Sequence, residues 1–202
     1  MIEIYNNGKL GIAVRHNFLS IDECEEMLAH SWQNLEEATV ISADGKGQKH
    51  VGRTGSHYFL RHDASPVIHG VAEKISQMVR IPLENAEPFQ IVHYDVGQEY
   101  SYHWDSFDKN DTDHYDGYVK TGGQRVLTVL GYLRDVPKGG ETGFNHYGIN
   151  VQPRAGTIVV WYNVDTKTLE RDEWSQHAGL PVIEGEKYAF NLWFREGKFN
   201  ND

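Results

Sequence analysis

Two early segments of the chain carry apolar residues at helical spacing. The first begins with Ser20 and Glu23, which form a capping box that satisfies free backbone N–H groups. The apolar positions on one face of this helix are Ile21, Cys24, Met27, Leu28, Trp32 and Leu35. The second helix begins at Ser65-Pro66, where proline suits the first helical position, and ends before Pro82. Its apolar stripe consists of Val67, Ile68, Val71, Ala72, Ile75, Met78 and Val79.

The pattern changes to short aromatic and β-branched runs, separated by glycine, from Phe89 onward. The predicted strands are 89–95, 98–105, 125–133, 149–152, 156–163, 176–183 and 187–195. Residues 42–56 and 106–121 lack periodicity and are predicted loops, the second rich in aspartate. Many short strands after two helices predict a mainly β protein, an antiparallel sandwich or barrel with the helices packed outside.

The last strand, 187–195, separates its residues into two faces. One face is apolar and can meet the helices, with Tyr188, Phe190, Leu192 and Phe194. The other face is mixed, with Lys187, Ala189, Asn191, Trp193 and Arg195. We expect the mixed face to line the interior of a ligand-binding barrel.

Length and charge exclude several classes of function. The 202 residues suit one domain, 1–202, and we expect helical support from 1–85 and a β core from 86–196. The net charge of −10 argues against nucleic acid and anionic lipid as partners. No apolar run is long enough to span a membrane, and the start lacks the pattern of a signal peptide. Because Cys24 is the single cysteine, no internal disulfide can form, and we expect a cytoplasmic protein.

His-x-Asp tripeptides are candidate metal-binding motifs, although the tripeptide alone is weak evidence because chance predicts about one in this chain. On a strand, both side chains point to one face, and with a distant histidine they can form a two-histidine, one-carboxylate iron site. Three such tripeptides occur, and they begin at His93, His103 and His114. His114 and Asp116 lie in the aspartate-rich loop, so we interpret them as solvated.

Context favours His103 and Asp105 as the ligand pair. His93 and Asp95 end a strand before a turn, and we interpret them as a satisfied polar pair. The aromatic residues Tyr100, Tyr102 and Trp104 alternate with His103 and Asp105, which predicts a rigid strand with both ligands on one side.

The third ligand and a charged anchor are expected further along the chain. His177 begins a predicted strand, whereas its competitor His146 lies in a glycine- and asparagine-rich turn. Lys187 lies on the inward phase of the last strand, where an ammonium group is unfavourable without a partner. It either reaches water at the strand end or binds the carboxylate of an organic acid.

Together these residues resemble the prolyl 4-hydroxylase family of Fe(II)- and 2-oxoglutarate-dependent dioxygenases. The order and spacing of the matching strings cover roughly residues 18–195. They are Arg53-Thr54-Gly55-Ser56, Tyr94-x-x-Gly97-Gln98-x-Tyr100-x-x-His103-x-Asp105-x-Phe107, Gly122-Gly123-Gln124-Arg125-Val126, Tyr132-Leu133, Gly139-Gly140-Glu141-Thr142 and His177-x-Gly179-x-Pro181-Val182-x-x-Gly185-x-Lys187, followed by Trp193. The family usually has serine where this chain has Gly55.

The resemblance implies a double-stranded β-helix, a jelly-roll or cupin-like core with helices on its major sheet. It implies that His103, Asp105 and His177 bind Fe(II), with O2 and 2-oxoglutarate as cosubstrates and ascorbate as a further cofactor. Lys187, Tyr94 and Thr142 would bind the far carboxylate of 2-oxoglutarate, and a lysine there indicates the collagen-type branch. The residues implied at the substrate are Arg125, Tyr100 and Trp193 in a prolyl pocket, and Arg53 and Ser56 in a loop that closes over a peptide.

The expected reaction is 4-hydroxylation of a prolyl residue in a peptide or protein, with succinate and CO2 as coproducts. The resemblance is to stand-alone bacterial or viral enzymes, and we expect a monomer or weak homodimer. The same chemistry on free proline or another small molecule is the alternative, and a metal-binding barrel without catalysis is disfavoured. Oxygenases of nucleic-acid repair share the ligand pattern and an Asn-Leu-x-Phe-Arg end, but the acidic charge argues against them.

Overall fold

The computed structural model describes residues 1–6, 8, 11–37, 39–41, 47–49, 54–112 and 114–200. Within these ranges an eight-stranded antiparallel sheet has the order β1-β2-β13-β9-β16-β7-β6-β3. Its strands are β1 (Ile2–Asn6), β2 (Gly11–Arg15), β3 (Glu36–Glu37), β6 (Ser56–Leu60), β7 (Phe89–Tyr94), β9 (Arg125–Tyr132), β13 (Ile158–Tyr162) and β16 (Lys187–Arg195). The predominance of strands confirms the mainly β prediction.

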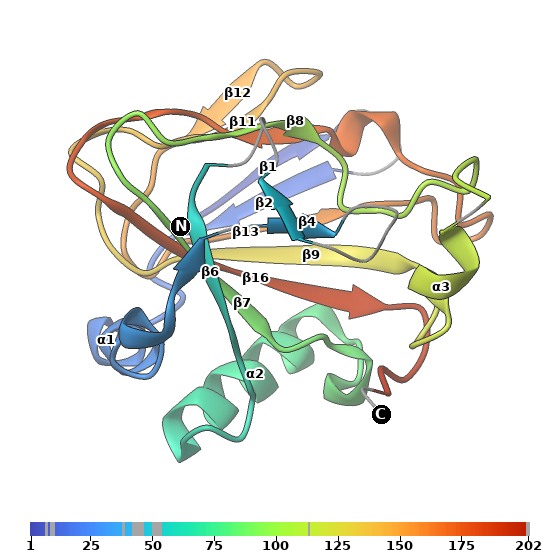
Figure 1. The fold of residues 1–202 in the computed structure, drawn as a ribbon, viewed down its shortest axis with the longest axis horizontal. Coiled ribbons are helices and arrows are strands. Elements are labelled where there is room, and N and C mark those ends of the chain that lie inside the picture. Colours follow the sequence, from blue (N-terminus) through green and yellow to red (C-terminus); the bar gives the residue numbers. More distant parts are fainter. Residues whose placement is uncertain are drawn as a thin grey trace.

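A smaller sheet of four strands packs against the inner face of the large sheet, which is the face away from the helices. Its strand order is β12-β11-β14-β8. Its strands are β8 (Tyr100–His103), β11 (Thr142–Phe144), β12 (Ile149–Val151) and β14 (His177–Gly179). Two further pairs are β10 (Lys138–Gly139) with β15 (Val182–Glu184), and β4 (Thr39–Ile41) with β5 (Gly47–Lys49). Figure 1 shows β8, β11 and β12 on one side of the large sheet and α1 and α2 on the other.

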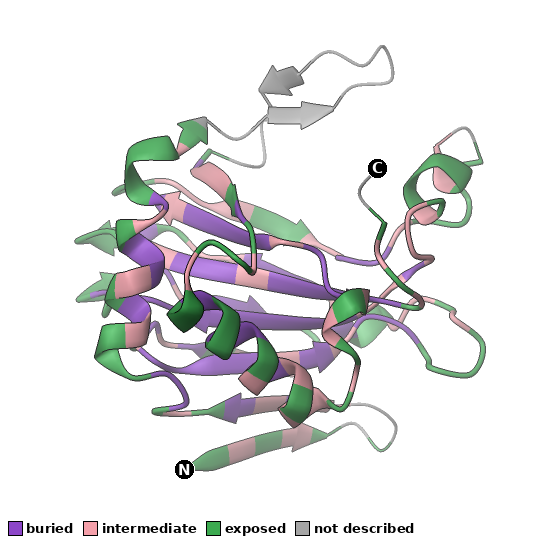
Figure 2. Ribbon diagram, turned by 90° about the horizontal axis from the view of Figure 1, so that it is seen from below, coloured by how far each residue is buried: buried purple, intermediate pink, exposed green. Residues whose placement is uncertain are grey.

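The helices α1 (Ile21–Ala29) and α2 (Pro66–Val79) cover the outer face of the large sheet. Their buried side chains pack against Phe190, Leu192 and Phe194, which confirms the predicted outer face of β16. Figure 2, seen from the helix side, shows the buried strands behind the two helices. A second core, which includes Tyr132 and Trp161, fills the space between the two sheets. The fold therefore leaves one interior, bounded by both sheets, for a ligand site.

Local chemistry sets the ends of the two helices. Ser20 and Glu23 form the predicted capping box, and Ser65 caps α2 through the Ile68 N–H group. The first helix is shorter than predicted. It ends because the Ser31 hydroxyl donates to the Met27 carbonyl, while the Ser31 N–H group donates to the Leu28 carbonyl in a 3₁₀-type bond. A 3₁₀ turn at Trp32–Asn34 follows, and Trp32 and Ile21 are exposed rather than buried.

The N-terminal region differs from the helical support expected for 1–85, because β1, β2, β3 and β6 join the large sheet. The strand β1 is an edge strand whose Ile2 and Ile4 are exposed, so it lacks the buried alternation that marks a strand in a sequence. The predicted loop at 42–56 includes β5 and the start of β6, and its residues 42–46 and 50–53 lie outside the described residues. The predicted loop at 106–121 contains the short helix α3 (Tyr115–Val119).

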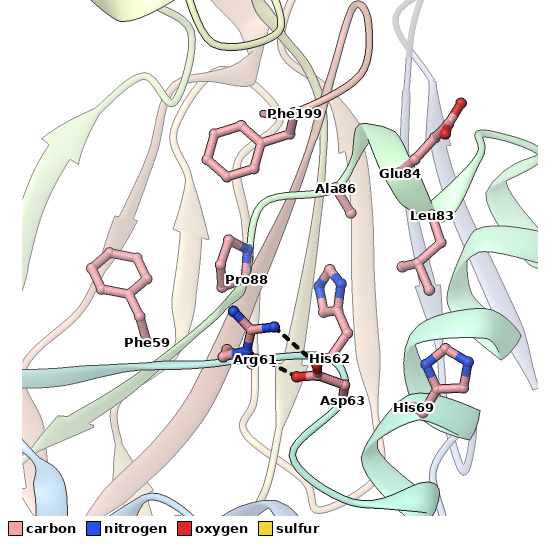
Figure 3. A pocket seen from close by; sticks show the side chains of 10 residues that line it. All are labelled: Phe59, Arg61, His62, Asp63, His69, Leu83, Glu84, Ala86, Pro88 and Phe199. Carbon is pink, nitrogen blue, oxygen red and sulfur yellow. Dashed lines mark hydrogen bonds and ion pairs between the residues drawn. The ribbon is translucent and has the colours of Figure 1, made fainter. Parts of the chain in front are cut away.

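One cavity, of about 570 Å³, lies at the helical side of the molecule. It is lined by Phe59, Leu83 and Phe199 and by the ion pair of Arg61 and Asp63, whose side chains are 2.9 Å apart (Figure 3). None of the residues predicted to bind metal, cosubstrate or substrate lines this cavity. None of the helices described is long and apolar enough to cross a membrane.

Candidate active site

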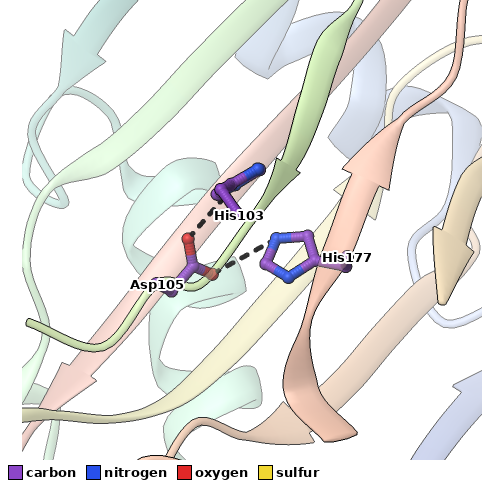
Figure 4. A group of neighbouring side chains, drawn as sticks. All are labelled: His103, Asp105 and His177. Carbon is purple, nitrogen blue, oxygen red and sulfur yellow. Dashed lines mark ion pairs between the residues drawn. The ribbon is translucent and has the colours of Figure 1, made fainter. Parts of the chain in front are cut away.

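The three predicted metal ligands converge between the two sheets. His103 ends β8 and His177 begins β14, and the two residues are direct partners in the antiparallel ladder. Their Nε2 atoms each lie 3.7 Å from an oxygen of Asp105, which lies between them (Figure 4). All three donor atoms fall within 4.8 Å of one another. One ion can therefore contact all three side chains.

Backbone carbonyls fix the tautomer of both histidines. The Nδ1 atom of His103 lies 2.8 Å from the Ser101 carbonyl, and that of His177 lies 2.9 Å from the Ser175 carbonyl. Because a carbonyl only accepts, Nδ1 carries the proton and donates it, which leaves the Nε2 lone pair directed at Asp105. Two neutral imidazoles and one carboxylate with open positions form the ligand set of non-haem Fe(II). The donor set therefore fits the expected metal.

Asp105 is held by a chain of buried hydrogen bonds that the sequence did not reveal. Thr128 donates its hydroxyl to Asp105 Oδ2 at 2.8 Å, and the Asn163 amide donates to Thr128 at 2.9 Å. Burial raises the pKa of Asp105, but His177, His103 and Arg125 outweigh this effect and lower the pKa below its ordinary value. The carboxylate is therefore kept ionised and oriented for a cation.

The strand at the metal site differs from the prediction in two respects. β8 ends at His103, so Asp105 is fixed by Thr128 rather than by a ladder. Tyr100 stacks on the His103 ring with centroids 3.6 Å apart, although alternation placed it on the opposite face. The register of β8 with β14 shifts between His177 and Gly179, and this irregularity turns Tyr100 toward the metal ligands.

Lys187 lies in the same interior, at the start of β16. It is 2% exposed, and within the described ranges no carboxylate forms an ion pair with it. Its Nζ lies 5.7 Å from the centroid of Tyr94 and 5.6 Å from that of Tyr132. Burial lowers the pKa of Lys187 to about 7, although Glu141 opposes this effect. An incoming carboxylate would restore the charge that burial disfavours.

The cavity beside Lys187 also contains the other residues predicted for the cosubstrate. Its lining includes Tyr94, Thr142 and Lys187 together with the metal ligands His103 and His177. The Tyr132 hydroxyl donates to Thr142 Oγ1 at 2.7 Å, and Tyr132 was not singled out as a ligand-site residue from the sequence. One cavity therefore reaches from two of the metal ligands to the buried ammonium group of Lys187.

Gly55 is required by the packing of Tyr94. A Cβ atom at Gly55 would lie 2.6 Å from the Tyr94 ring and 2.4 Å from the His93 carbonyl oxygen. The usual serine of the family would therefore displace a side chain of the cosubstrate cavity. Ser56, which follows, was predicted in a closing loop but lies in β6, paired with His93. Arg53 lies outside the described residues.

Arg125 and Trp193 pack together near Asp105. The Arg125 guanidinium lies 3.6 Å from the centroid of the Trp193 ring, and it donates to both carboxylate oxygens of Glu87 at 2.6 and 2.8 Å. Arg195 donates to the same carboxylate at 2.6 Å. Sequence reasoning missed Glu87, because a single glutamate outside any strand carries no spacing signal. Because both guanidinium groups share the Glu87 carboxylate, the Arg125 side chain is oriented and stays positively charged.

The competing histidines His93, His114 and His146 lie apart from the triad. His146 is exposed beside Trp174, and His114 pairs with Asp111 at 2.8 Å. The interpretation of His93 and Asp95 as a satisfied pair is wrong. Their closest polar atoms are 3.8 Å apart, and His93 Nε2 forms no hydrogen bond with any described residue. Asp95 follows the end of β7, so no ladder brings its carboxylate onto the imidazole.

Comparisons with known proteins agree with this geometry. The model of the 2OG-Fe(II) oxygenase superfamily matches residues 89–195, which include all three metal ligands and Lys187. Prolyl 4-hydroxylase 5 of Arabidopsis thaliana is 34% identical over 206 residues, which cover 92% of this chain and 68% of that protein. Prolyl 4-hydroxylase 1 of the same plant is 35% identical over 201 residues, which cover 92% and 69%.

Among solved structures, the viral collagen prolyl hydroxylase of Paramecium Bursaria Chlorella virus-1, in complex with 2OG, matches with a TM-score of 0.72 and 25% identity. The match covers 91% of this chain and 95% of the viral one. The fold is therefore the jelly-roll core of the 2-oxoglutarate oxygenases, and the site is that of an Fe(II)- and 2-oxoglutarate-dependent dioxygenase. The chain belongs to the prolyl 4-hydroxylase family of this superfamily.

Proposed function

We propose that this dioxygenase hydroxylates a prolyl residue, at its 4-position, in a peptide or protein. The observation that carries the proposal is a cavity lined by His103, His177 and Lys187, with Arg125 stacked on Trp193 and close enough to Asp105 to lower its pKa. The prolyl 4-hydroxylase relatives and the viral collagen prolyl hydroxylase support a prolyl substrate.

The metal and the cosubstrate would be bound by different residues of the site. His103, Asp105 and His177 hold Fe(II), which supplies the oxidation of an unactivated C–H bond when O2 and 2-oxoglutarate are bound. Lys187 binds the far carboxylate of 2-oxoglutarate, and Tyr94 and Thr142 line the same end of the cavity. We also propose ascorbate as a further cofactor.

In the proposed substrate pocket, two aromatic side chains and one arginine contact the peptide. Trp193 and Tyr100 offer flat faces that suit the ring of proline, and Arg125 offers donors for a peptide carbonyl. Because Glu87 holds Arg125 at two points, those donors are oriented before the peptide arrives. We include Arg53 as a further peptide contact, whereas the Ser56 hydroxyl lies 3.4 Å from His93 Nδ1 and is left out of the proposed peptide site.

The proposed setting is the cytoplasm, and the proposed state is a monomer or weak homodimer. Cys24, the single cysteine, is buried and burial raises the pKa of its thiol to about 11. The protein therefore needs no oxidising compartment for its fold.

A panel assay tests the proposed substrate. Purified protein is supplied with Fe(II), 2-oxoglutarate and ascorbate, and then with proline-rich peptides, alanine-substituted controls or free proline. We expect succinate release together with a gain of one oxygen on proline in the peptide, and neither on the alanine control. Oxygen gain on free proline alone would replace the peptide substrate with the small-molecule alternative. Oxygen gain on no proline-containing compound would refute prolyl hydroxylation.

A further inference from the structure

A second group of potential metal ligands lies on the opposite face of the large sheet from the cosubstrate cavity. His93 on β7, Asp95 just after it and Glu186 just before β16 place three donor atoms within 4.8 Å of one another. His93 and Tyr94 are consecutive on a strand and so point to opposite faces. Glu186 likewise directly precedes Lys187. We call His93, Asp95 and Glu186 the outer cluster.

The imidazole of His93 is largely buried, and its Nε2 atom is directed into the outer cluster. Its side chain is 13% exposed, packed against the Tyr188 ring with centroids 4.4 Å apart. The Nε2 atom is inaccessible to solvent and forms no hydrogen bond with any described residue. Its nearest polar neighbours are Glu186 Oε1 at 3.5 Å and Asp95 Oδ1 at 3.8 Å, too far for hydrogen bonds. A buried nitrogen without a hydrogen bond is unfavourable, and a cation bound between it and the two carboxylates would satisfy it.

The other ring nitrogen, Nδ1, lies 3.4 Å from the Ser56 hydroxyl. If Nδ1 donates to that hydroxyl, the lone pair on Nε2 faces two carboxylates, and only a cation can satisfy all three acceptors. The same division of roles holds at the triad, where Nδ1 donates to a carbonyl and Nε2 faces Asp105. The outer cluster therefore shares its donor arrangement with an established type of metal site.

The separations in the outer cluster fit a small transition-metal ion. Zinc binds imidazole nitrogen and carboxylate oxygen at about 2.0–2.2 Å, so two tetrahedral ligands lie about 3.4 Å apart. Glu186 meets this value at 3.5 Å, and Asp95 at 3.8 Å lies about 0.4 Å beyond it. The carboxylates are 51% and 60% exposed, which gives an ion access from solvent. An imidazole with two carboxylates favours a first-row transition metal over Mg²⁺ or Ca²⁺.

We propose that His93, Asp95 and Glu186 form a second binding site for a divalent first-row transition metal, distinct from the iron site. Such an ion would join the end of β7 to the start of β16. Tyr94 and Lys187, which lie at these two points and are direct partners in the ladder, line the cosubstrate cavity. The outer site would thus stabilise the end of the sheet that holds the cosubstrate anchor.

Calorimetric titration of the metal-free full chain with Zn²⁺ tests the proposal without any assay of turnover. We expect two Zn²⁺ per wild-type chain, and one per chain in H177A, where the iron site is lost. The variant H93Q should also bind one, and the double variant H93Q/H177A should bind none. The matched control is E184Q, which removes an equivalent exposed charge two residues from Glu186 and should leave two Zn²⁺ per chain.

A second measurement covers the case in which a variant folds poorly. In H177A, added Zn²⁺ should raise the thermal midpoint by several degrees, and adding H93Q or E186Q to H177A should abolish that shift. Circular dichroism of each variant verifies its fold. One Zn²⁺ per wild-type chain would overturn the proposal and leave His93 as a protonated ion-pair partner. Retention of the second Zn²⁺ in both H93Q and E186Q would also overturn it.

Discussion

The triad His103, Asp105 and His177 and the outer cluster have nearly the same spacing of donor atoms but different surroundings. Nitrogen-to-oxygen separations are 3.7 Å in the triad and 3.5 and 3.8 Å in the outer cluster. In the triad, carbonyls hold both imidazoles and Thr128 holds the carboxylate. In the outer cluster both carboxylates are largely exposed and only His93 is enclosed.

The difference shows that donor spacing identifies a place for an ion, whereas the surroundings determine its chemistry. The triad opens into a cavity that also contains a buried cation, so an organic anion can bind beside the metal. The outer cluster opens to solvent. Only the first arrangement can exclude water and orient a cosubstrate.

Loss of a triad ligand should have the largest effect. We expect His177→Ala to reduce hydroxylation by at least about a thousandfold, because the iron loses one of three protein ligands. The chain should stay folded, since His177 contributes little apolar core. Hydroxylation is measured as oxygen gain by mass spectrometry, with circular dichroism as the test of folding.

The matched substitution in the outer cluster is His93→Gln, which should leave iron-dependent hydroxylation within about twofold of wild type. If His177→Ala hydroxylated at the normal rate with iron bound, His177 would matter no more to the reaction than His93. That result would contradict the assignment of catalysis to the triad alone.

Replacement of Lys187, the buried cation of the cosubstrate cavity, should have the next largest effect. Lys187→Ala should raise the 2-oxoglutarate concentration for half-maximal rate by about 100-fold, since losing one partner of a buried charge pair costs about 3 kcal/mol. The half-saturating peptide concentration should change far less. Steady-state kinetics with each substrate varied in turn provide the comparison. A larger change for the peptide than for 2-oxoglutarate would contradict the assignment of Lys187.

Removal of the hydroxyl that orients Asp105 should have a smaller effect. Thr128→Val keeps the shape of the side chain but removes its bond to the carboxylate, and we expect iron affinity to fall by about 30-fold. The affinity of the outer cluster for Zn²⁺ should not change, because Thr128 lies in the other site. Competition with a chelator measures both affinities. Unchanged iron affinity would show that Asp105 needs no such support.

The pH dependence of cosubstrate binding should show the smallest effect. The pKa of Lys187 is about 7 in the free protein, so the cation that binds a carboxylate is lost as the pH rises above 7. The affinity for 2-oxoglutarate should therefore fall about tenfold from pH 7.5 to 8.5. Lys187→Arg, which stays charged, should flatten the profile. A flat profile in the wild-type protein would contradict a titrating Lys187.

The parts of the fold and site that sequence predicted are those with a periodic or motif signal. The alternation in 187–195 predicted both faces of β16, and the His-x-Asp spacing with His177 predicted the metal ligands. Edge strand β1 was missed because its outward residues are apolar and exposed. The β8 irregularity at Tyr100 was missed because a strand pattern assumes unbroken alternation.

Residues that support the ligands left no signal in the sequence. Thr128, Asn163 and Glu87 come from different segments and meet only through the fold. Each is a single polar residue, and a single polar residue carries no spacing signal that distinguishes it from a solvated one. The unsatisfied nitrogen of His93 was likewise invisible, because hydrogen bonding depends on atomic distances that spacing does not give.

The metal triad and the Lys187 anchor are tested most directly by a crystal structure of the protein with 2-oxoglutarate and with Mn²⁺ in place of iron. Anomalous scattering would locate the metal. We expect an anomalous peak bound by His103, Asp105 and His177, with the far carboxylate of 2-oxoglutarate at hydrogen-bond distance from Lys187 Nζ. A triad without metal, or a carboxylate bound away from Lys187, would contradict the proposed centre.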